Sequence, residues 1–346
     1  MFRNNISLYK KSISCCVLLL LLYGCSSSRN ELFFTPDNYL VWPEPPEKPR
    51  IRYMGTISTE NDLKKKNSFN FDLGELFFGK KKVGVLISPY AVAIDHDYKL
   101  YITDTSAGIV HIFDLPRRQY KQFGKISKKE NLQKPVGIDV INNWVYVVDS
   151  VMHKVFIFDN KGKYLFSFGD DVLIRPSGIT HSRDDKEVFI VDTGGHAIIE
   201  FTSGGKFIKK IGSRGIDPGL FNFPTQICLD NNGKIYVSDT LNYRVQVFSN
   251  QWIPQIIFGQ QGDRPGNFAH PCGIATDSFD NIYVLDRQFE NIQIFNSQGQ
   301  ILMAFGQEGT NPGQFWLPSG ICIDDHNRIY VADSFNKRVQ IFQLLE

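Results

Sequence analysis

The sequence predicts an all-β fold, a six-bladed β-propeller closed by an N-terminal strand at about residues 50–57 that completes the last blade. The main observation is a repeat. An aspartate follows an apolar strand six times, at spacings of 43 to 47 residues, and a proline stands 14 to 16 residues ahead of each aspartate. Short strands that recur with such a period are typical of propellers and other repeat folds. The aspartates are Asp104, Asp149, Asp192, Asp239, Asp286 and Asp333, and the prolines are Pro89, Pro135, Pro176, Pro224, Pro271 and Pro318.

Each repeat is expected to form four strands, here called a to d. In the sixth repeat, strand a covers residues 319–324, strand b residues 328–331 and strand c residues 338–342, and the preceding repeat supplies a strand d at residues 300–305. β-Branched and aromatic residues dominate these segments, whereas Asn, Asp and Gly fill the turns. Three of the loops from strand d to the next strand a contain Pro-Gly-x-Phe, at residues 218–221, 265–268 and 312–315. We expect their phenylalanines to pack between neighbouring sheets.

The two ends of the repeat region indicate how the ring closes. Only four residues follow Phe342, which is too few for the fourth strand of the last repeat. An apolar segment that belongs to no repeat, residues 50–57, lies ahead of the first one. If it pairs with the last strand c, the ring closes and its open sheet edges disappear.

The N-terminus has the features of a secretory signal. Three basic residues and no acid precede an apolar run over residues 16–22, which is too short to span a membrane. The run ends in Leu22-Tyr23-Gly24-Cys25, which resembles the lipobox of bacterial lipoproteins. The resemblance implies that residues 1–24 are a lipoprotein signal peptide and that Cys25 carries acyl chains such as palmitate. The alternative is an ordinary cleaved signal with an incidental cysteine.

Ser26 follows Cys25 where aspartate would favour the inner membrane, so the same resemblance implies anchoring in the outer membrane of a bacterial cell envelope. We interpret residues 25–49 as a lipid-anchored Ser/Pro-rich tether, and residues 50–346 as the propeller, with an insertion at about residues 59–82. Without residues 1–24, 35 basic residues stand against 36 acidic ones. This near-neutral balance gives no reason to expect a nucleic-acid partner.

Two segments carry a resemblance to a known repeat family. Residues 242–248 read Asn-Tyr-Arg-Val-Gln-Val-Phe and residues 336–342 read Asn-Lys-Arg-Val-Gln-Ile-Phe, each behind Tyr-Val-x-Asp. Both look like NHL repeats, and the order of tether, closing strand and six repeats resembles bacterial NHL-repeat lipoproteins. The resemblance implies a six-bladed propeller. Blades one, three and five depart from the Asn-x-Arg pattern but keep the spacing and the strand-forming residues.

We expect the six aspartates to be structural, because each ends strand b where a carboxylate can accept backbone N–H groups of the following turn. A metal needs ligands that converge at one point, not one ligand in each blade. The NHL fold is similar to that of a lyase in which, the resemblance implies, histidines of different blades hold zinc. Beside the strand-a prolines of this chain only His270 could serve. We therefore expect no metal and no cofactor.

Because the repeat positions are architecture, a functional site is expected among the residues that depart from the repeat. The loops that lead into strand a and those that join strands b and c should share one face, where Tyr and Arg are common contact residues. The candidate binding residues are Tyr90, Arg175, Gln226, Tyr243, Arg287, Phe289 and Phe335.

No catalytic residue is identified, and the favoured hypothesis is a monomeric, non-catalytic scaffold that binds an envelope protein. Two alternatives stay open. One is a lyase- or lactonase-like enzyme with a site at the mouth of the central channel, and the other is a carbohydrate or cell-wall binding module.

Overall fold

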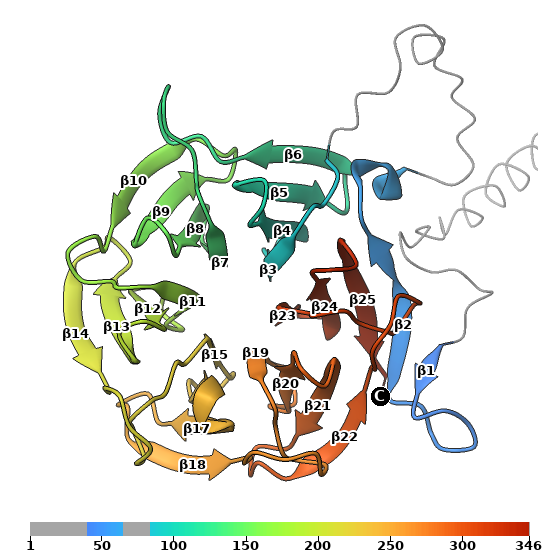
Figure 1. The fold of residues 1–346 in the computed structure, drawn as a ribbon. Coiled ribbons are helices and arrows are strands. Elements are labelled where there is room, and N and C mark those ends of the chain that lie inside the picture. The colour runs from blue at the N-terminus through green and yellow to red at the C-terminus, as the bar shows by residue number, and fades with distance from the viewer. Residues whose placement is uncertain (1–39, 65–83, 346) are drawn as a thin grey trace, which may run out of the picture. The chain divides into compact units, whose positions relative to one another are not determined.

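The computed structural model describes residues 40–64 and 84–345, which belong to one compact unit. The predicted signal peptide, Cys25, most of the predicted tether and most of the predicted insertion lie outside these residues. Six antiparallel sheets surround a central axis, as Figure 1 shows, so the predicted six-bladed β-propeller is confirmed. In the part of the chain that is described, no helix is long and apolar enough to cross a membrane.

Blades one to five each contain four consecutive strands, in the order a to d from the channel outward. Blade one contains β3 (Pro89–Ile94), β4 (Lys99–Asp104), β5 (Ile109–Asp114) and β6 (Gln119–Phe123). Blade two contains β7 (Pro135–Ile141), β8 (Trp144–Asp149), β9 (Lys154–Asp159) and β10 (Tyr164–Phe168). Blade three contains β11 (Pro176–His181), β12 (Glu187–Asp192), β13 (Ala197–Thr202) and β14 (Phe207–Ile211). Blade four contains β15 (Gln226–Leu229), β16 (Ile235–Asp239), β17 (Arg244–Phe248) and β18 (Pro254–Phe258). Blade five contains β19 (Pro271–Thr276), β20 (Ile282–Asp286), β21 (Asn291–Phe295) and β22 (Ile301–Phe305).

The sixth blade joins the two ends of the propeller. Its strands β23 (Gly320–Ile323), β24 (Arg328–Asp333) and β25 (Arg338–Leu344) come from the C-terminus, and β2 (Ile51–Ile57) pairs antiparallel with β25. The predicted N-terminal closure is therefore confirmed (Figure 1). A short 3-10 helix, η1 (Glu60–Leu63), follows β2, and its capping box is formed by Thr59 and Asp62.

The blade contains one strand more than the sequence indicated. Strand β1 (Val41–Trp42) pairs with β2, although residues 41–42 lie within the segment interpreted as tether. The Trp42 ring lies 5.5 Å from the ring of Phe305 and 5.7 Å from that of Phe342. Ordered packing thus begins ahead of residue 50, because a single large aromatic side chain finds an apolar surface at the edge of blade six.

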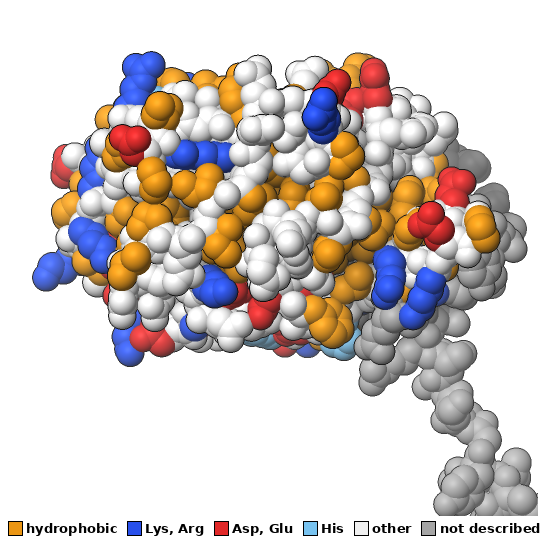
Figure 2. Space-filling model, turned by 90° about the horizontal axis from the view of Figure 1, so that it is seen from below, with side chains coloured by type: hydrophobic (Ala, Val, Ile, Leu, Met, Phe, Trp, Pro, Cys, Tyr) orange, Lys and Arg blue, Asp and Glu red, His pale blue; other side chains and the backbone are white. Residues whose placement is uncertain are grey.

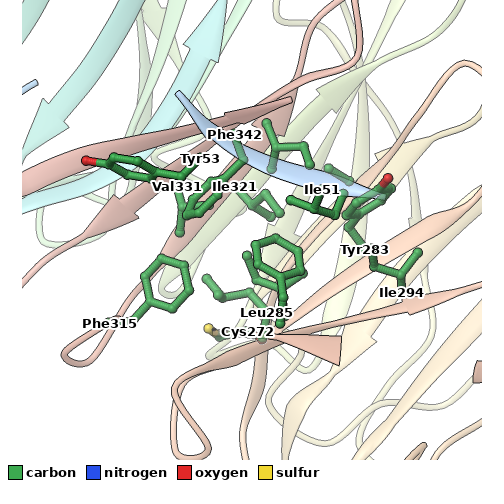
Figure 3. Close-up of a cluster of buried hydrophobic side chains, with 14 residues drawn as sticks. Ile51, Tyr53, Cys272, Tyr283, Leu285, Ile294, Phe315, Ile321, Val331 and Phe342 are labelled. Atoms are coloured by element: carbon green, nitrogen blue, oxygen red, sulfur yellow. Dashed lines mark hydrogen bonds between the residues drawn. The ribbon is translucent and has the colours of Figure 1, made fainter. Parts of the chain in front are cut away.

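The closing strand contributes to the core as well as to the sheet. Figure 3 shows Ile51 and Tyr53 of β2 among side chains of blades five and six, with Phe342 and Phe315 beside them. Ile51 is fully buried, and the Tyr53 ring lies 5.7 Å from the Phe342 ring. Strand β2 therefore joins the apolar layer between two blades.

The Pro-Gly-x-Phe loops behave as predicted. Phe221, Phe268 and Phe315 are fully buried and belong to apolar clusters that span two neighbouring blades. Each ring also lies 5.7 to 5.9 Å from the last phenylalanine of strand c in its own blade. The ring of Phe221 leaves no room for a side chain at Gly212, whose Cβ would sit 2.6 Å from it and whose φ of +78° also favours glycine.

The six strand-b aspartates hold the loops of one end together. All six are at most 1% exposed, and each accepts at least one backbone N–H from the two residues ahead of its blade's proline. Asp104 accepts from Ile87 and Ser88 and also from Ala107 in the turn between strands b and c. Burial raises the pKa of Asp104, but the nearby His111 imidazole and these backbone hydrogen bonds outweigh it and hold the pKa at about 2.

Blades four and six share an additional arginine. Arg244 Nε donates to Asp239 at 2.8 Å, and Arg338 Nε donates to Asp333 at 2.7 Å. The remaining guanidinium nitrogens donate to carbonyls of the Pro-Gly-x-Phe loop, at residues 216, 217 and 220 in blade four and 310, 311 and 314 in blade six. The Asn-x-Arg pattern therefore fixes this long loop to its blade.

Shortening Ile51 should open a cavity between blades five and six. We expect Ile51→Ala to lower the free energy of unfolding by about 2–5 kcal/mol, because the lost side chain is fully buried. Urea unfolding followed by circular dichroism measures it. Leu302→Ala is the matched control, since Leu302 is 54% exposed on β22 and should cost less than about 0.5 kcal/mol. Equal losses in the two variants would contradict a structural role for the closing strand.

Candidate binding face

One end of the propeller gathers the residues that depart from the repeat. Strand a begins where strand b ends, as the pairing of Pro89 with Asp104 illustrates, so the loops there lie on one face. We call it the proline face and define it by the two residues ahead of each strand-a proline and the four residues after each strand-b aspartate. The opposite face holds the turns between strands a and b and between strands c and d.

The proline face exposes a large apolar side chain in five of the six blades. Trp316 and Phe335 of blade six form a pair whose ring centroids are 5.6 Å apart, and they are 46% and 52% exposed. The exposed apolar residues of the face are Ile87, Val151, Ile174, Leu241, Trp316 and Phe335. Figure 2 shows apolar side chains on the side of the propeller as well. Ile257 of β18 and Leu302 of β22 are examples of exposed apolar residues on the outer strands.

The charged side chains of the proline face are almost all basic. Lys134, Arg175, Arg287 and Lys337 lie at these positions, where the only acid is Glu290, which is 7% exposed and accepts the N–H of Leu317. Exposed acids, among them Asp170, Asp217 and Asp263, lie farther along the loops that lead into strand a. None of the four cations forms an ion pair with another described residue. By contrast, several cations of the opposite face are paired: Lys99 with Asp95 and Asp97, Lys186 with Asp184, and Arg328 with Asp324.

A ring of hydroxyl groups links most blades just beneath this face. The residue after the strand-a proline donates to the carbonyl of its counterpart in the next blade, as Ser177 does to Thr225 at 2.8 Å and Ser319 does to Tyr90 at 2.7 Å. The residue after the strand-b aspartate adds a second such bond, for example from Ser334 to the Pro89 carbonyl at 2.6 Å. These hydrogen bonds satisfy carbonyl oxygens that burial removes from water, and they hold neighbouring blades together.

Three blades depart from the hydroxyl ring on the channel side. The position after the strand-b aspartate holds Ser or Thr in five blades but Arg287 in blade five. The position after the strand-a proline holds Tyr90 in blade one, Val136 in blade two and Cys272 in blade five. The Arg287 guanidinium is near enough to the Tyr90 hydroxyl for its charge to act on the pKa of Tyr90. Burial raises the pKa of Tyr90, while Arg287 acts in the opposite direction. Two departures from the repeat, 197 positions apart in the chain, thus meet.

Cys272 and His270 lie next to this pair. Burial raises the pKa of the Cys272 thiol to about 12, so it stays protonated and unreactive at neutral pH. Burial also lowers the pKa of His270, and the nearby positive charge of Arg287 acts in the same direction. The charges that act on these two residues are the Arg287 guanidinium and the buried Asp286 carboxylate, in opposite directions.

The structure places the other predicted residues apart from this pair. Arg175 is exposed and lies over the Phe223 ring at 5.5 Å, whereas Phe335 contacts Trp316. Tyr243 packs against the apolar cluster between blades four and five. Phe289 is half-buried in its turn, and the Gln226 side chain accepts the N–H of Ile227.

Several residues of the face escaped the sequence reasoning. Val151, Leu241 and Phe335 all stand two positions after a strand-b aspartate, and Ile87, Ile174 and Trp316 all stand two positions before a strand-a proline. Only Phe335 was chosen as a candidate. Aligning the repeats position by position, instead of searching for large polar residues, would have found the other five.

Blades two and three are joined by a different contact, because Val136 occupies the hydroxyl position of blade two. On the opposite face His181 Nδ1 of blade three lies 2.7 Å from the Asp139 carboxylate of blade two. The negative charge of Asp139 raises the pKa of His181 against the effect of burial. This pair depends on the charge of His181, unlike the hydroxyl bonds of the other blades.

No group of three or more His, Cys, Asp or Glu side chains suited to a metal ion occurs within residues 40–64 and 84–345. The strand-b aspartates accept hydrogen bonds within their own loops, as described above.

Comparison with known proteins agrees with this architecture. Residues 221–248 and 315–342, in blades four and six, match the NHL repeat family. The chain is 27% identical over 135 residues to protein brain tumor of Drosophila melanogaster, and 27% identical over 177 residues to antigen Lp49 of Leptospira interrogans. These matches cover 37% and 49% of this chain, but only 12% and 36% of the two relatives.

Among solved structures, virginiamycin B lyase from Staphylococcus aureus superposes with a TM-score of 0.53 at 15% identity, over 75% of this chain and 95% of the lyase. A likeness at this identity concerns the fold. The protein is thus a six-bladed β-propeller that contains NHL repeats, and the two matched repeats are the blades in which arginine fixes the Pro-Gly-x-Phe loop.

The buried thiol at the channel should resist alkylation. We expect Cys272 to remain unmodified by iodoacetamide at about pH 8 in the folded protein and to react fully in urea, because its pKa is raised to about 12. Peptide mass spectrometry measures the extent of labelling at each cysteine. Rapid labelling of the folded protein would show that the channel mouth is open to solvent around the thiol.

The Asp139–His181 contact should make stability depend on pH. The folded-state pKa of His181 is raised above the ordinary value of 6.5, so the contact contributes fully below pH 6.5 and is lost as the pH rises through the raised pKa. We expect the stability difference between wild type and His181→Gln to shrink across this range, as measured by urea unfolding. His326→Gln, on an exposed turn of the same face, is the control. A difference that does not vary with pH would contradict the role of the charge.

Proposed function

We propose that this chain is a lipid-anchored protein of the bacterial cell envelope that binds another protein through the proline face. The observation that carries the proposal is the combination, on this one face, of exposed apolar side chains with unpaired lysines and arginines. Contact surfaces between proteins are enriched in aromatic residues and arginine. Lipidation at Cys25 and an outer-membrane location remain predictions from the sequence, and they concern residues outside those described.

A rigid scaffold suits this role. The loops of the proline face are held by the buried aspartates, by the hydroxyl ring and, in blades four and six, by arginine. Binding then costs little ordering of loops, and the surface offered to a partner is formed in advance. The propeller would act by displaying these loops, without chemistry of its own.

An enzyme of the lyase or lactonase type is the second candidate. The observation in its favour is the Tyr90–Arg287 pair at the channel, together with the fold shared with virginiamycin B lyase. Against it, the thiol of Cys272 is held protonated, and the strand-b aspartates are engaged in the loops. Fold alone does not carry function.

A carbohydrate-binding module is less well supported. Sugar rings stack on flat aromatic surfaces, and the exposed pair Trp316 and Phe335 is tilted by 50°. The two rings therefore do not form one flat platform.

Substitutions on the proline face should release the partner. After light crosslinking in cells and purification in mild detergent, we expect mass spectrometry to find one near-stoichiometric protein. The double variant Trp316→Ala and Phe335→Ala should reduce its recovery at least tenfold or so, because exposed aromatics are common hot spots. Phe279→Ala, 61% exposed on the opposite face, is the control and should retain the partner.

Recovery of no protein, but of one tightly bound metal per chain, would contradict the scaffold proposal and favour the enzyme. Equal loss in the control variant would show that a different face is used.

A further inference from the structure

The residue ahead of each strand-a proline donates its backbone N–H in one of two ways. In blades one, two, three and five the acceptor is the strand-b aspartate of the same blade. In blades four and six the Oδ2 atom of that aspartate accepts instead from asparagine, arginine and glutamine side chains. There the N–H goes to the preceding blade. Phe223 donates to Nδ1 of His196 at 3.2 Å, and Leu317 donates to the Glu290 carboxylate at 2.9 Å.

The two loops with this arrangement have a strained backbone. The φ angle is +50° at Phe223 and +45° at Leu317, in the left-handed region that large residues rarely adopt. The proline that follows restricts these residues further. The equivalent residues of the other four blades do not have a positive φ. The acceptor on the preceding blade therefore stabilises a strained conformation, and we expect the loop to relax when that acceptor is lost.

His196 can serve as this acceptor only when it is neutral. A backbone N–H donates to Nδ1 only if that nitrogen carries no proton, and an imidazolium has two donors and no acceptor. Protonated His196 would thus turn an N–H group toward the N–H group of Phe223. Glu290 differs, because a carboxyl group keeps an acceptor oxygen after it is protonated.

The charged groups around His196 oppose a further positive charge. The His196 ring lies 4.2 Å from the Phe223 ring, and the Arg175 guanidinium lies over the same ring at 5.5 Å. Burial lowers the pKa of His196, and Arg214 and Arg175 act in the same direction. The negative charge of Asp192 acts in the opposite direction, but its carboxylate already accepts the N–H groups of the loop ahead of blade three.

The loop that His196 holds also supports part of the proline face. The Asn222 amide donates to the Leu241 carbonyl at 3.1 Å, and the Leu241 N–H donates to the Asn222 carbonyl at 3.0 Å. Leu241 is one of the exposed apolar residues of the face, and Arg175, on the other side of Phe223, is one of its cations. Release of Phe223 would therefore disturb contact residues of blades three and four.

We propose that His196 is an acid-sensitive latch, which holds the loop ahead of blade four in its binding conformation while neutral and releases it when protonated. This inference rests on the proposed function, because it concerns the regulation of the same face. The folded-state pKa of His196 is lowered from the ordinary value of 6.5. The contribution of the latch is therefore complete above pH 6.5 and is lost as the pH falls through the lowered pKa.

Amide hydrogen exchange of the purified protein, followed by NMR, tests the latch without a partner. Between about pH 7.5 and about pH 5 we expect the protection factor of the Phe223 N–H to fall about tenfold, since one hydrogen bond is lost. The Leu317 N–H is the internal control, because its carboxyl acceptor persists, and its protection should change less than about threefold.

Two variants make the outcome decisive. His196→Asn keeps an acceptor at the same distance along the side chain as Nδ1, does not titrate and tolerates the φ of +52° found here, so it should abolish the pH dependence at Phe223. His196→Gly has the residue that blade one has at this position, Gly108, and should leave Phe223 weakly protected at both pH values. Equal protection in the wild type at the two pH values would overturn the proposal. So would a fall that persists in His196→Asn, or full protection in His196→Gly.

The effect on binding is measured with the partner identified by crosslinking. We expect immobilised wild-type protein to retain at least about threefold less partner at pH 5 than at pH 7.5, because a released loop must be ordered again on binding. In His196→Asn the ratio between the two pH values should be close to one. The same ratio in both proteins would show that acid acts at another place, and would overturn the regulation.

Failure of the latch and failure of the proposed function give different results. If the partner is lost from Trp316→Ala/Phe335→Ala but is retained equally by the wild type at both pH values, the face binds a protein and the latch does not regulate it. If no partner is found at either pH, the proposed function is wrong, and its regulation is wrong with it.

Discussion

The rest of the structure depends on a buried carboxylate at the end of each strand b. This aspartate accepts N–H groups from the loop ahead of strand a, and in most blades also from the turn that follows it. A buried charge of this kind is stable only while these donors point at it. It therefore determines the conformation of the loop ahead of strand a in all six blades, and of the following turn in five of them. The proline face is rigid because a single residue type organises its loops in every blade.

The long loops that lead into blades four, five and six need a further constraint. Side chains of strand c supply it, and their number differs between these blades. Blades four and six have both arginine and glutamine on strand c. Blade five keeps only the glutamine, whose side chain accepts the N–H of Gly266 and donates to the Asn267 carbonyl. In blades two and three, where the loop into strand a is shorter, Phe156 and Ile199 take the glutamine position. Blades four and six, which have both arginine and glutamine, are the blades that match the family pattern.

Much of the fold could be predicted from the sequence, because the information is local and repeated. Aspartate, proline and strand spacing recur six times, and the count of strands at the two ends requires closure by residues 50–57. Strand β1 could not be predicted, because its two residues have no periodicity and are held by Trp42 against Phe305 and Phe342. The tyrosine–aspartate bonds of four blades, such as Tyr236 to Asp230 at 2.8 Å, were missed although a spacing of six residues repeats in the sequence.

The candidate site was only partly predictable for a physical reason. Tyr90 and Arg287 were both chosen because they depart from the repeat, but their proximity depends on the curvature of the ring, which brings blades one and five toward the channel. The separation of Tyr90 and Arg287 along the chain does not predict their proximity, because the residues between them form three complete blades. The repeat does show which residue to expect at each position of a blade, so a residue that differs from its equivalents in the other blades can be recognised. Hydroxyl groups of blades three, four and six donate to carbonyls of the next blade, and a residue without such a hydroxyl gives up that bond. Tyr90 and Arg287 are two such residues, and their side chains act on each other across the sixth blade.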